Sequence, residues 1–445
     1  MDEWIDRRAL LRAGGLAGVG LLAGCSDEED MDGSTTNGTA EGTTTVTETS
    51  PAPADCPEGP IEADEEPGTA TLWHNRLDGR TISETDLIET ARSQFNSVTD
   101  HSIETSRIPD SSFVAYLTAD IPEGDGPYLF EWRHSRAGRF DSDGYLSDQS
   151  GNVDIPKCMI TDSARRAARY RGKRIGVPWA AETVALFYNE DMVDSPPETL
   201  AEMKSVMSDY HDPENGKYGL GFPVDAFYVS GFAQAYGEDI YDGEADELGL
   251  NTDEVQKGLR VVMEDLKPYM PEGTSRGDQR PVFENGNAPF YIGGPWDLSA
   301  LRDAKAVDLG VTTLPDLSDG GTPRPYMGVK LFYFASKMDT GASAGAARDF
   351  AEWFASNEQL LLEHANKGNF IPVHAGLVDD PAMPDSMAAF ARQFEDAYPM
   401  PQNPKMDQVW NPFGDAVVQT FNGNGDLGEN LAAAEAEIRA DWADD

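Results

Sequence analysis

The sequence predicts an α/β protein with more than one lobe, and two observations support this prediction. The chain has 445 residues, which is too many for one ordinary hydrophobic core. From Gly68 onward, short apolar stretches typical of strands alternate with segments of helical periodicity. This alternation indicates mostly parallel sheets covered by helices, and ligands bind such sheets at the carboxyl ends of their strands.

The expected elements follow one another along the chain. The predicted strands are TATLWHN (69–75), HSIETSRI (101–108), PYLFEW (127–132), RIGVPW (174–179) and VALFYNED (184–191). Apolar residues at 87, 88, 91 and 95 recur at helical spacing, with Ser83 as the N-cap. A second helix is expected from Ala346 to Lys367, and Gly368 would end it.

The charge of the chain excludes several partners. There are 79 Asp+Glu against 34 Lys+Arg, a formal net charge of -45, which would repel nucleic acid and an anionic membrane surface. In molar salt the Debye length is about 3 Å, so this self-repulsion would be screened. We therefore favour a halophilic source over binding of a cationic partner.

The N-terminal residues predict export and lipid attachment. Arg7 and Arg8 precede an apolar run from Ala13 to Ala23, which is too short for a membrane span. The paired arginines resemble a twin-arginine (Tat) export signal, and LAGC is the pattern that precedes a lipidated cysteine. The alternative, a buried N-terminal helix, is disfavoured by the many glycines. We predict a signal over residues 1–24 and a lipid on Cys25 at the extracellular face of the membrane.

The residues that follow predict a tether. Residues 25–67 are acidic and threonine-rich, with almost no large apolar side chain, so they are expected to be disordered. If Cys25 carries a lipid, two cysteines remain, Cys56 and Cys158. Outside the cell these could pair and fix the end of the tether to the domain, but the sequence leaves this open.

Enzyme signatures are missing from the sequence. It contains no HExxH, GxxxxGK[ST], GxSxG or CxxC pattern, and its six histidines are scattered. We therefore expect no catalytic residue, no cofactor and no metal.

Aromatic residues beside single polar groups favour a sugar site. Such groups occur at expected strand ends and loops: Trp132 before RHSR, Glu182 after VPWAA, Asp225, Phe227 and Tyr228 in PVDAFYVSG, Trp296 after YIGGP, and Trp410. The apolar face of a pyranose packs on flat rings, and its hydroxyls need donors and acceptors. Each aromatic taken alone is better explained by core packing, so the hypothesis depends on the set.

Five segments carry a family resemblance. In chain order they are GDGPYLFEWRHSRAG, RYRGKRIGVPWAAETVALFYNEDMV, FENGNAPFYIGGPWDLSALR, LGVTTLPDL and MPQNPKMDQVW. From about Gly68 to its end the chain resembles the extracellular solute-binding proteins of sugar ABC importers, and within them the maltose/maltodextrin-binding proteins. The resemblance implies a two-lobed periplasmic-binding-protein fold with discontinuous lobes, a hinge and a sugar cleft. It also implies a monomer that delivers a maltodextrin-like oligosaccharide to a membrane permease.

The resemblance places the lobes and the site residues. Crossings are expected near 179–181, 327–329 and 372–378, which gives lobe 1 as 68–180 plus 329–375 and lobe 2 as 181–328 plus 376–445. The implied ligand contacts of lobe 1 are Asn75, Asp78, Trp132, Ser135 and Arg136, together with Glu182, which directly follows the first crossing. Those of lobe 2 are Asp225, Phe227, Tyr228, Trp296, Met406 and Trp410.

The sequence departs from the family pattern at several of these positions. Ser135 replaces the aspartate of an Asp-Arg pair, Asp78 alone remains of an Asp-Lys pair, and Gly414 replaces an arginine. Arg133 and Arg139 are expected to balance local acid charge.

Three alternatives remain open. The ligand could be another sugar, such as trehalose, glucose or an arabino-oligosaccharide. The protein could instead be a tethered carbohydrate-active enzyme, which would need two suitably spaced carboxylates, or a structural surface lipoprotein.

Overall fold

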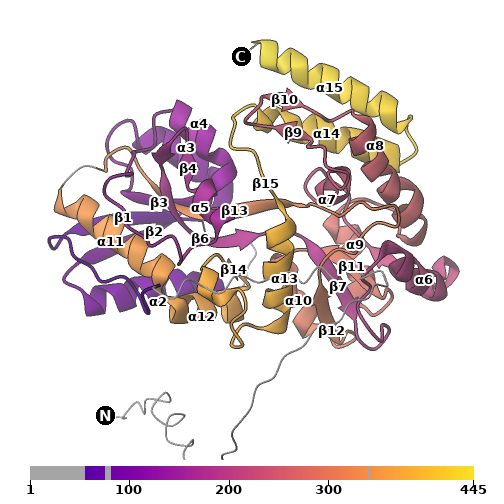
Figure 1. Ribbon diagram of the computed structural model, residues 1–445, viewed down its shortest axis with the longest axis horizontal. Helices are drawn as coiled ribbons and strands as arrows, with labels where there is room; N and C mark the ends of the chain where they lie inside the picture. The colour runs from indigo at the N-terminus through magenta and orange to yellow at the C-terminus, as the bar shows by residue number, and fades with distance from the viewer. Residues whose placement is uncertain (1–55, 76–81, 339–340, 445) are drawn as a thin grey trace, which may run out of the picture. The chain divides into compact units, whose positions relative to one another are not determined.

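The computed structural model describes residues 56–75, 82–338 and 341–444 (Figure 1). The predicted export signal, Cys25, Asp78 and most of the predicted tether lie outside these residues. No helix in the described ranges is both long enough and apolar enough to cross a bilayer.

The first sheet has seven strands in the order β14-β6-β13-β3-β1-β2, with β15 paired to β13. The strands are β1 (Thr69–His74), β2 (Ser102–Arg107), β3 (Leu129–Arg133), β6 (Gly176–Glu182), β13 (Tyr326–Phe334), β14 (Ile371–Pro372) and β15 (Tyr398–Pro399). β1 runs parallel to β2 and β3, whereas β13 runs antiparallel to β3 and β6. The expectation of mostly parallel sheets is therefore wrong here, because β13 returns the chain against β6.

Helices and a small hairpin cover the first sheet and define, with it, the first lobe. They are α2 (Ile82–Val98), α3 (Asp110–Asp120), η1 (His134–Arg136), α4 (Ala137–Ser142), α5 (Asp162–Ala167), β4 (Arg169–Tyr170), β5 (Lys173–Arg174), α11 (Ala342–Ser356), α12 (Glu358–Gly368) and η6 (Ala375–Leu377). The helix expected over 346–367 is in fact two helices, because the Asn357 side chain accepts from Leu360 N and starts a new one. The end of this helix lies one residue later than predicted, because Gly368 is still helical and Asn369 takes the left-handed conformation that ends it.

The second lobe is built on a sheet of order β12-β7-β11-β8. Its strands are β7 (Ala185–Asn189), β8 (Leu220–Gly221), β11 (Phe290–Gly293) and β12 (Leu309–Thr312), with a hairpin of β9 (Tyr241–Asp242) and β10 (Glu247–Leu248). β7 is antiparallel to both β11 and β12. This sheet too is mixed.

Helices surround the second sheet. They are α6 (Leu200–Tyr210), η2 (Pro213–Asn215), α7 (Ser230–Ala233), α8 (Asp253–Arg260), the π-helix η3 (Val261–Leu266), η4 (Lys267–Tyr269), α9 (Arg276–Glu284), η5 (Pro295–Asp297), α10 (Leu298–Asp303), α13 (Asp385–Asp396), α14 (Met406–Phe421) and α15 (Leu427–Asp444). α6 begins with a capping box in which Thr199 and Glu202 satisfy each other's backbone N–H groups. α14 and α15 pack against each other in the second core.

The buried apolar side chains form two clusters, and the first extends beneath the second sheet, where it includes Phe187 and Tyr291. Tyr326 packs in the second cluster, and Met327 and Val329 pack in the first, so β13 passes from one to the other at its start. Figure 1 shows β6 and β13 between the helices of the two lobes. α13 packs on both β12 of the second sheet and β14 of the first.

Residues 56–67, which we call the N-terminal strap, differ from the expected tether. They pack on the first lobe, because α11 supplies partners to a segment that has little apolar surface of its own. Ile61 N donates to Ser356 Oγ at 2.8 Å, and Arg348 Nη2 lies 2.6 Å from Glu65 Oε1. Cys56 and Cys158 form a disulfide, which settles the pairing that the sequence left open.

Candidate functional site

Two of the predicted contacts of the first lobe have partners inside that lobe. Asn75 directly follows β1, and its Nδ2 donates to Asp110 Oδ1 at 2.6 Å, at the start of α3. Trp132 on β3 is only 8% exposed, and its ring stacks on Phe113 at 4.8 Å between centroids. Trp132 is therefore mostly buried in the first core, which differs from the open stacking surface that the resemblance implies.

Glu182, at the end of β6, lies between two cations. Its carboxylate is within 2.5 Å of Arg133 Nε and 3.2 Å of Lys330 Nζ. The strand register brings these side chains together. In the sheet, Lys330 of β13 lies opposite Arg133 of β3, and Gly328 of β13 lies opposite Glu182 of β6. The Glu182 carboxylate raises the pKa of Arg133. The expected charge-balancing roles are confirmed for Arg133 and for Arg139, which pairs with Asp143 at 3.0 Å.

Arg136 forms an ion pair that reaches the second lobe. The guanidinium, in η1, lies 2.5 Å from Asp407 Oδ2 in the first turn of α14. The backbone follows the same contact, because Gly138 N donates to Gln402 O at 3.1 Å. Ser135, beside Arg136 in η1, is half-buried. Sequence reasoning missed Asp407, although it directly follows Met406, one of the residues implied by the resemblance.

The second lobe brings four predicted residues together. Asp225 Oδ1 accepts from the backbone N–H groups of Phe227 and Tyr228, both at 2.9 Å, which folds the turn between them. Trp296 Nε1 donates to Tyr228 Oη at 3.1 Å. The Phe227 and Trp296 ring centroids lie 6.1 Å apart, and both side chains stay partly exposed. We call Asp225, Phe227, Tyr228 and Trp296 the aromatic group.

A buried carboxylate fixes the turn that carries Trp296. Asp297 is fully buried and accepts from Arg276 Nε at 2.6 Å, Tyr291 Oη at 3.2 Å and Gly294 N at 3.3 Å. Burial, with Asp297 nearby, raises the pKa of Tyr228, which keeps this hydroxyl neutral. The indole is thus positioned from both sides before any ligand binds. Asp297 was not predicted, and its position next to Trp296 was the only signal.

Helix α14 connects these parts. Asp407, in its first turn, contacts Arg136, and Trp410 packs edge-on against Tyr326 at 5.4 Å. At the next turn, a Cβ on Gly414 would lie 3.8 Å from Ala226 Cβ, inside the aromatic-group loop. Positions 406, 410 and 414 share one helix face over about 12 Å. Met406 itself is buried in the second core.

Metal ligands do not gather in the described part of the chain. It contains no group of three or more His, Cys, Asp or Glu side chains able to hold a metal ion. A pocket of about 790 Å³ lies between the N-terminal strap, the end of α2 and α12, and none of the predicted ligand contacts lines it.

Comparison with known proteins identifies the class to which this fold belongs. Residues 90–391 match the model of the bacterial extracellular solute-binding protein family. The chain is also 34% identical over 358 residues to the maltotriose-binding protein of Pyrococcus abyssi (strain GE5 / Orsay), covering 79% of this chain and 77% of that protein. The chain therefore belongs to the bacterial extracellular solute-binding protein family.

Further relatives and solved structures agree with this assignment. A maltooligosaccharide ABC transporter solute-binding lipoprotein of Streptococcus pneumoniae (strain ATCC BAA-255 / R6) is 24% identical over 329 residues, which cover 70% of this chain and 75% of the relative. An extracellular solute-binding protein from Staphylococcus aureus, solved with maltose, has a TM-score of 0.72 at 25% identity, over 85% of this chain and 98% of that one. A cyclo/maltodextrin-binding protein complexed with maltotetraose, at 24% identity, reaches a TM-score of 0.75 over the same shares. The predicted two-lobed α/β binding-protein fold is confirmed.

Proposed function

We propose that this protein is the substrate-binding lipoprotein of an ABC importer. It captures maltose/maltodextrin-type oligosaccharides between its lobes and delivers them to a membrane permease. The aromatic group carries the proposal, because it holds two partly exposed rings, Phe227 and Trp296, in a fixed arrangement that suits sugar faces. The ligand class is supported by the likeness to the Pyrococcus abyssi protein.

The proposed ligand contacts are the residues predicted from the sequence, with two changes of role. Trp132 acts as a mostly buried support that offers little surface to a ligand, since it is 8% exposed and Phe113 covers one of its faces. The Arg136 guanidinium is paired with the Asp407 carboxylate, so it must release this partner before its planar set of N–H donors can bind sugar hydroxyls. Glu182 keeps its place between Arg133 and Lys330 and accepts from a hydroxyl.

The proposed mechanism is closure about the crossings, with the lobes divided as predicted from the sequence. A ligand favours the closed form only through contacts that improve on closure. Stacking on the second lobe and hydrogen bonds to the first would meet this condition together. No bond is made or broken in the sugar, so the protein is not an enzyme.

The proposed location is the extracellular face of the membrane, with twin-arginine export and a lipid on Cys25. Relatives from Streptococcus pneumoniae that are named lipoproteins support the anchor. In cells, Cys25→Ser should move the protein from the membrane fraction to the medium. Sedimentation of the released protein should give a monomer, and dilution into low salt should unfold it if the source is halophilic.

Calorimetric titration of the full chain with maltotriose and maltotetraose tests the function. Maltooligosaccharides should bind more tightly than trehalose, glucose, arabino-oligosaccharides and galacto-oligosaccharides, and chromatography should recover them uncut. If another sugar bound more tightly, that sugar would replace maltooligosaccharides as the proposed ligand. Shortened products would indicate an enzyme, and no binding to any sugar would indicate a structural lipoprotein.

A further inference from the structure

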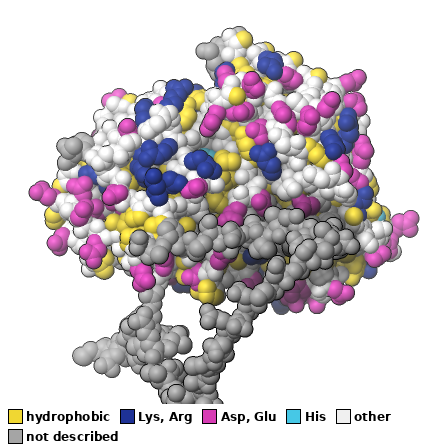
Figure 2. Space-filling view, in the orientation of Figure 1, with side chains coloured by type: hydrophobic (Ala, Val, Ile, Leu, Met, Phe, Trp, Pro, Cys, Tyr) yellow, Lys and Arg dark blue, Asp and Glu magenta, His cyan; other side chains and the backbone are white. Residues whose placement is uncertain are grey.

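The cations of this acidic chain gather on one part of the first lobe. Residues 157–174 contain seven of its 34 Lys and Arg residues but only one acid, Asp162, of its 79. Six of the seven form what we call the basic surface, and they are Lys157, Arg165, Arg166, Arg169, Arg171 and Arg174. Figure 2 shows dark blue side chains gathered over the first lobe, in contrast to the magenta of other parts of the same face.

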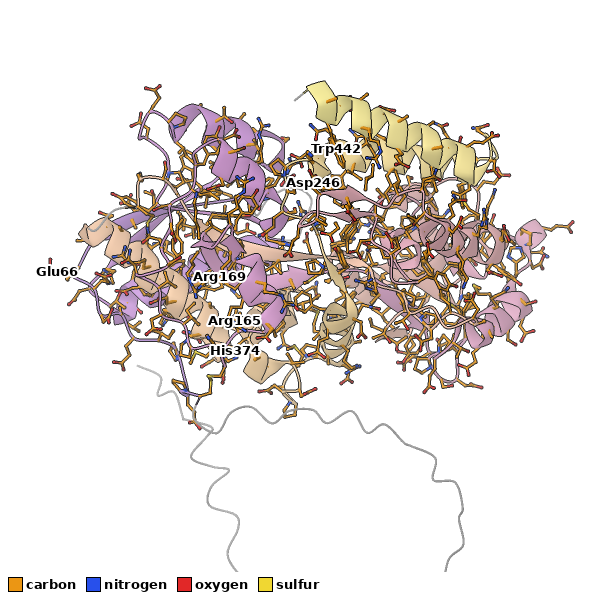
Figure 3. The ribbon with its side chains drawn as sticks, turned by 45° about the horizontal axis from the view of Figure 1, so that its top comes forward. Glu66, Arg165, Arg169, Asp246, His374 and Trp442 are labelled. Carbon is orange, nitrogen blue, oxygen red and sulfur yellow. A yellow bond between two sulfur atoms is a disulfide. The ribbon has the colours of Figure 1, made fainter. Side chains whose placement is uncertain are left out.

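These side chains lie close together and are poorly neutralised. Arg169 and Arg174 pair across the β4–β5 hairpin, and Figure 3 labels Arg165 and Arg169 on the same side of the first lobe. Burial lowers the pKa of Arg174, and the charges of Arg169 and Arg165 lower it further, although Glu352 and Asp154 oppose them. Arg165 pairs with Asp162, the acid of this segment. Among these six side chains, the ion pair within the described residues is that of Arg165.

The β4–β5 hairpin presents two of the exposed groups, Arg169 and Arg171. Arg171 and Gly172 form its tip with positive φ angles of 48° and 82°. The Arg171 guanidinium lies 5.2 Å from the Tyr170 ring, and Arg166, Arg169 and Arg171 are exposed. Exposed arginines with an adjacent tyrosine suit a surface that offers phosphate oxygens above an apolar layer, because guanidinium binds phosphate through paired hydrogen bonds.

The disulfide places Cys56, the first residue that the structure describes, at this surface. Cys158 directly follows Lys157, and its Cα lies 5.9 Å from that of Cys56, where the described chain begins. Whatever holds residues 1–55 is therefore connected to the domain beside the basic surface. Under the proposed lipid attachment at Cys25, the anchored chain joins the domain beside these cations, which lets this side of the lobe reach the membrane.

We propose that the basic surface binds the anionic phosphate headgroups of the membrane to which the protein is anchored. The proposal rests on the anchor part of the proposed function and is independent of the sugar. The net charge of -45 opposes approach at long range, so binding is local and depends on contacts within a Debye length. Docking would hold the first lobe at the membrane, while the second stays free to close.

Vesicle flotation of the full chain carrying Cys25→Ser, in the lowest salt concentration at which the chain stays folded, tests the proposal. The probes are vesicles of phosphatidylglycerol with phosphatidylcholine and vesicles of phosphatidylcholine alone. The apolar run at residues 13–23 contributes to both, so the ratio of the two partition coefficients isolates the charge effect. The test variant is R166Q/R169Q/R171Q. The matched control, K217Q/R260Q/K305Q, removes three exposed cations of the second lobe.

The test variant should lose about tenfold or more in this ratio, whereas the control should stay within about twofold, and added salt should weaken binding. Equal losses in both variants, or no preference for anionic vesicles, would overturn the proposal. So would a test variant that binds vesicles normally but no longer supports sugar uptake, since this outcome indicates an acidic protein partner. Maltotriose titration of both triple variants separates these results from the sugar-binding proposal. Maltotriose affinity should be unchanged in both, because none of the six substituted residues is a proposed ligand contact.

Discussion

The two lobes bring different chemistry to the candidate site. The first lobe contributes charged and polar groups that already have protein partners, as in the Glu182 pairs and the Arg136–Asp407 pair. The second lobe contributes partly exposed rings held in place by neutral hydrogen bonds, as in the Trp296–Tyr228 contact. Under the proposed function, sugar binding on the first lobe is an exchange of partners, whereas on the second lobe it adds contacts. We expect the second lobe to supply most of the affinity and the first to set selectivity.

Trp132 provides the strongest test of this comparison. It is an aromatic residue, like those of the second lobe, but it lies mostly buried in the first lobe. Trp132→Ala should lower the free energy of unfolding by about 3–5 kcal/mol, since it empties a mostly buried site against Phe113. Denaturant unfolding measures this loss. If stability is unchanged and maltotriose affinity disappears, Trp132 is an open stacking surface and the lobes are more alike than we propose.

His134 extends the comparison to pH, because its ring is buried where β13 leaves the second lobe. Its Nδ1 accepts from Val329 N at 3.0 Å, and burial lowers its pKa from 6.5 to about 4. The neutral ring is favoured in the folded state, so this stabilisation is complete above pH 6.5 and is lost as the pH falls toward 4.

The loss should reach about 3 kcal/mol at pH 4. His134→Asn keeps an acceptor for Val329 N but does not titrate. Between pH 6.5 and 4 the wild type should therefore lose about 3 kcal/mol more stability than the variant, by denaturant unfolding at each pH. Other titrating groups, such as His374 and Glu352, cancel in this difference. If the unfolding free energies of the wild type and the variant fell in parallel with pH, His134 would not be held in its neutral form by burial.

Trp296 tests the second lobe directly. Trp296→Ala should weaken maltotriose binding by about 1–3 kcal/mol, because a stacking face is lost. Stability should change less than in the Trp132 variant, since Trp296 is partly exposed. Trp296→Phe keeps a ring but removes the donor to Tyr228, so it should fall between the two in calorimetric titration. Unchanged affinity in both variants would remove Trp296 from the site.

The sequence could predict the α/β class and the loops of the aromatic group because their signals are local, whereas the two-lobed fold was implied by the family resemblance. The hydrophobic pattern of each short segment indicates a strand or a helix, and Phe227, Tyr228 and Trp296 lie beside polar residues in expected loops. The ion partners of the first lobe could not be found in this way. Arg136 and Asp407 are 271 residues apart, and with 79 acids in the chain no pairing of one acid with one cation stands out. Burial of Trp132 was equally hidden, because its stacking partner, Phe113, lies on a separate helix.

The Arg136–Asp407 pair should give the smallest effect and the finest comparison. Both side chains are partly exposed, 43% and 33%, so the pair itself contributes about 0.2–1 kcal/mol. If Arg136 must leave Asp407 to bind a sugar, Asp407→Asn should raise maltotriose affinity by at most about fivefold, and molar salt should remove the gain. Arg136→Lys should lower affinity, because a single ammonium lacks the planar fork of donors.

A double-mutant cycle of these two variants separates competition from cooperation. In Arg136→Lys the Asp407→Asn gain should shrink, because the substituted lysine side chain holds the carboxylate less firmly than the guanidinium does. A loss of affinity in Asp407→Asn would reverse the interpretation. Asp407 would then be a sugar acceptor, supplied from the second lobe in place of the aspartate that Ser135 replaces, and charged ligand contacts would belong to both lobes.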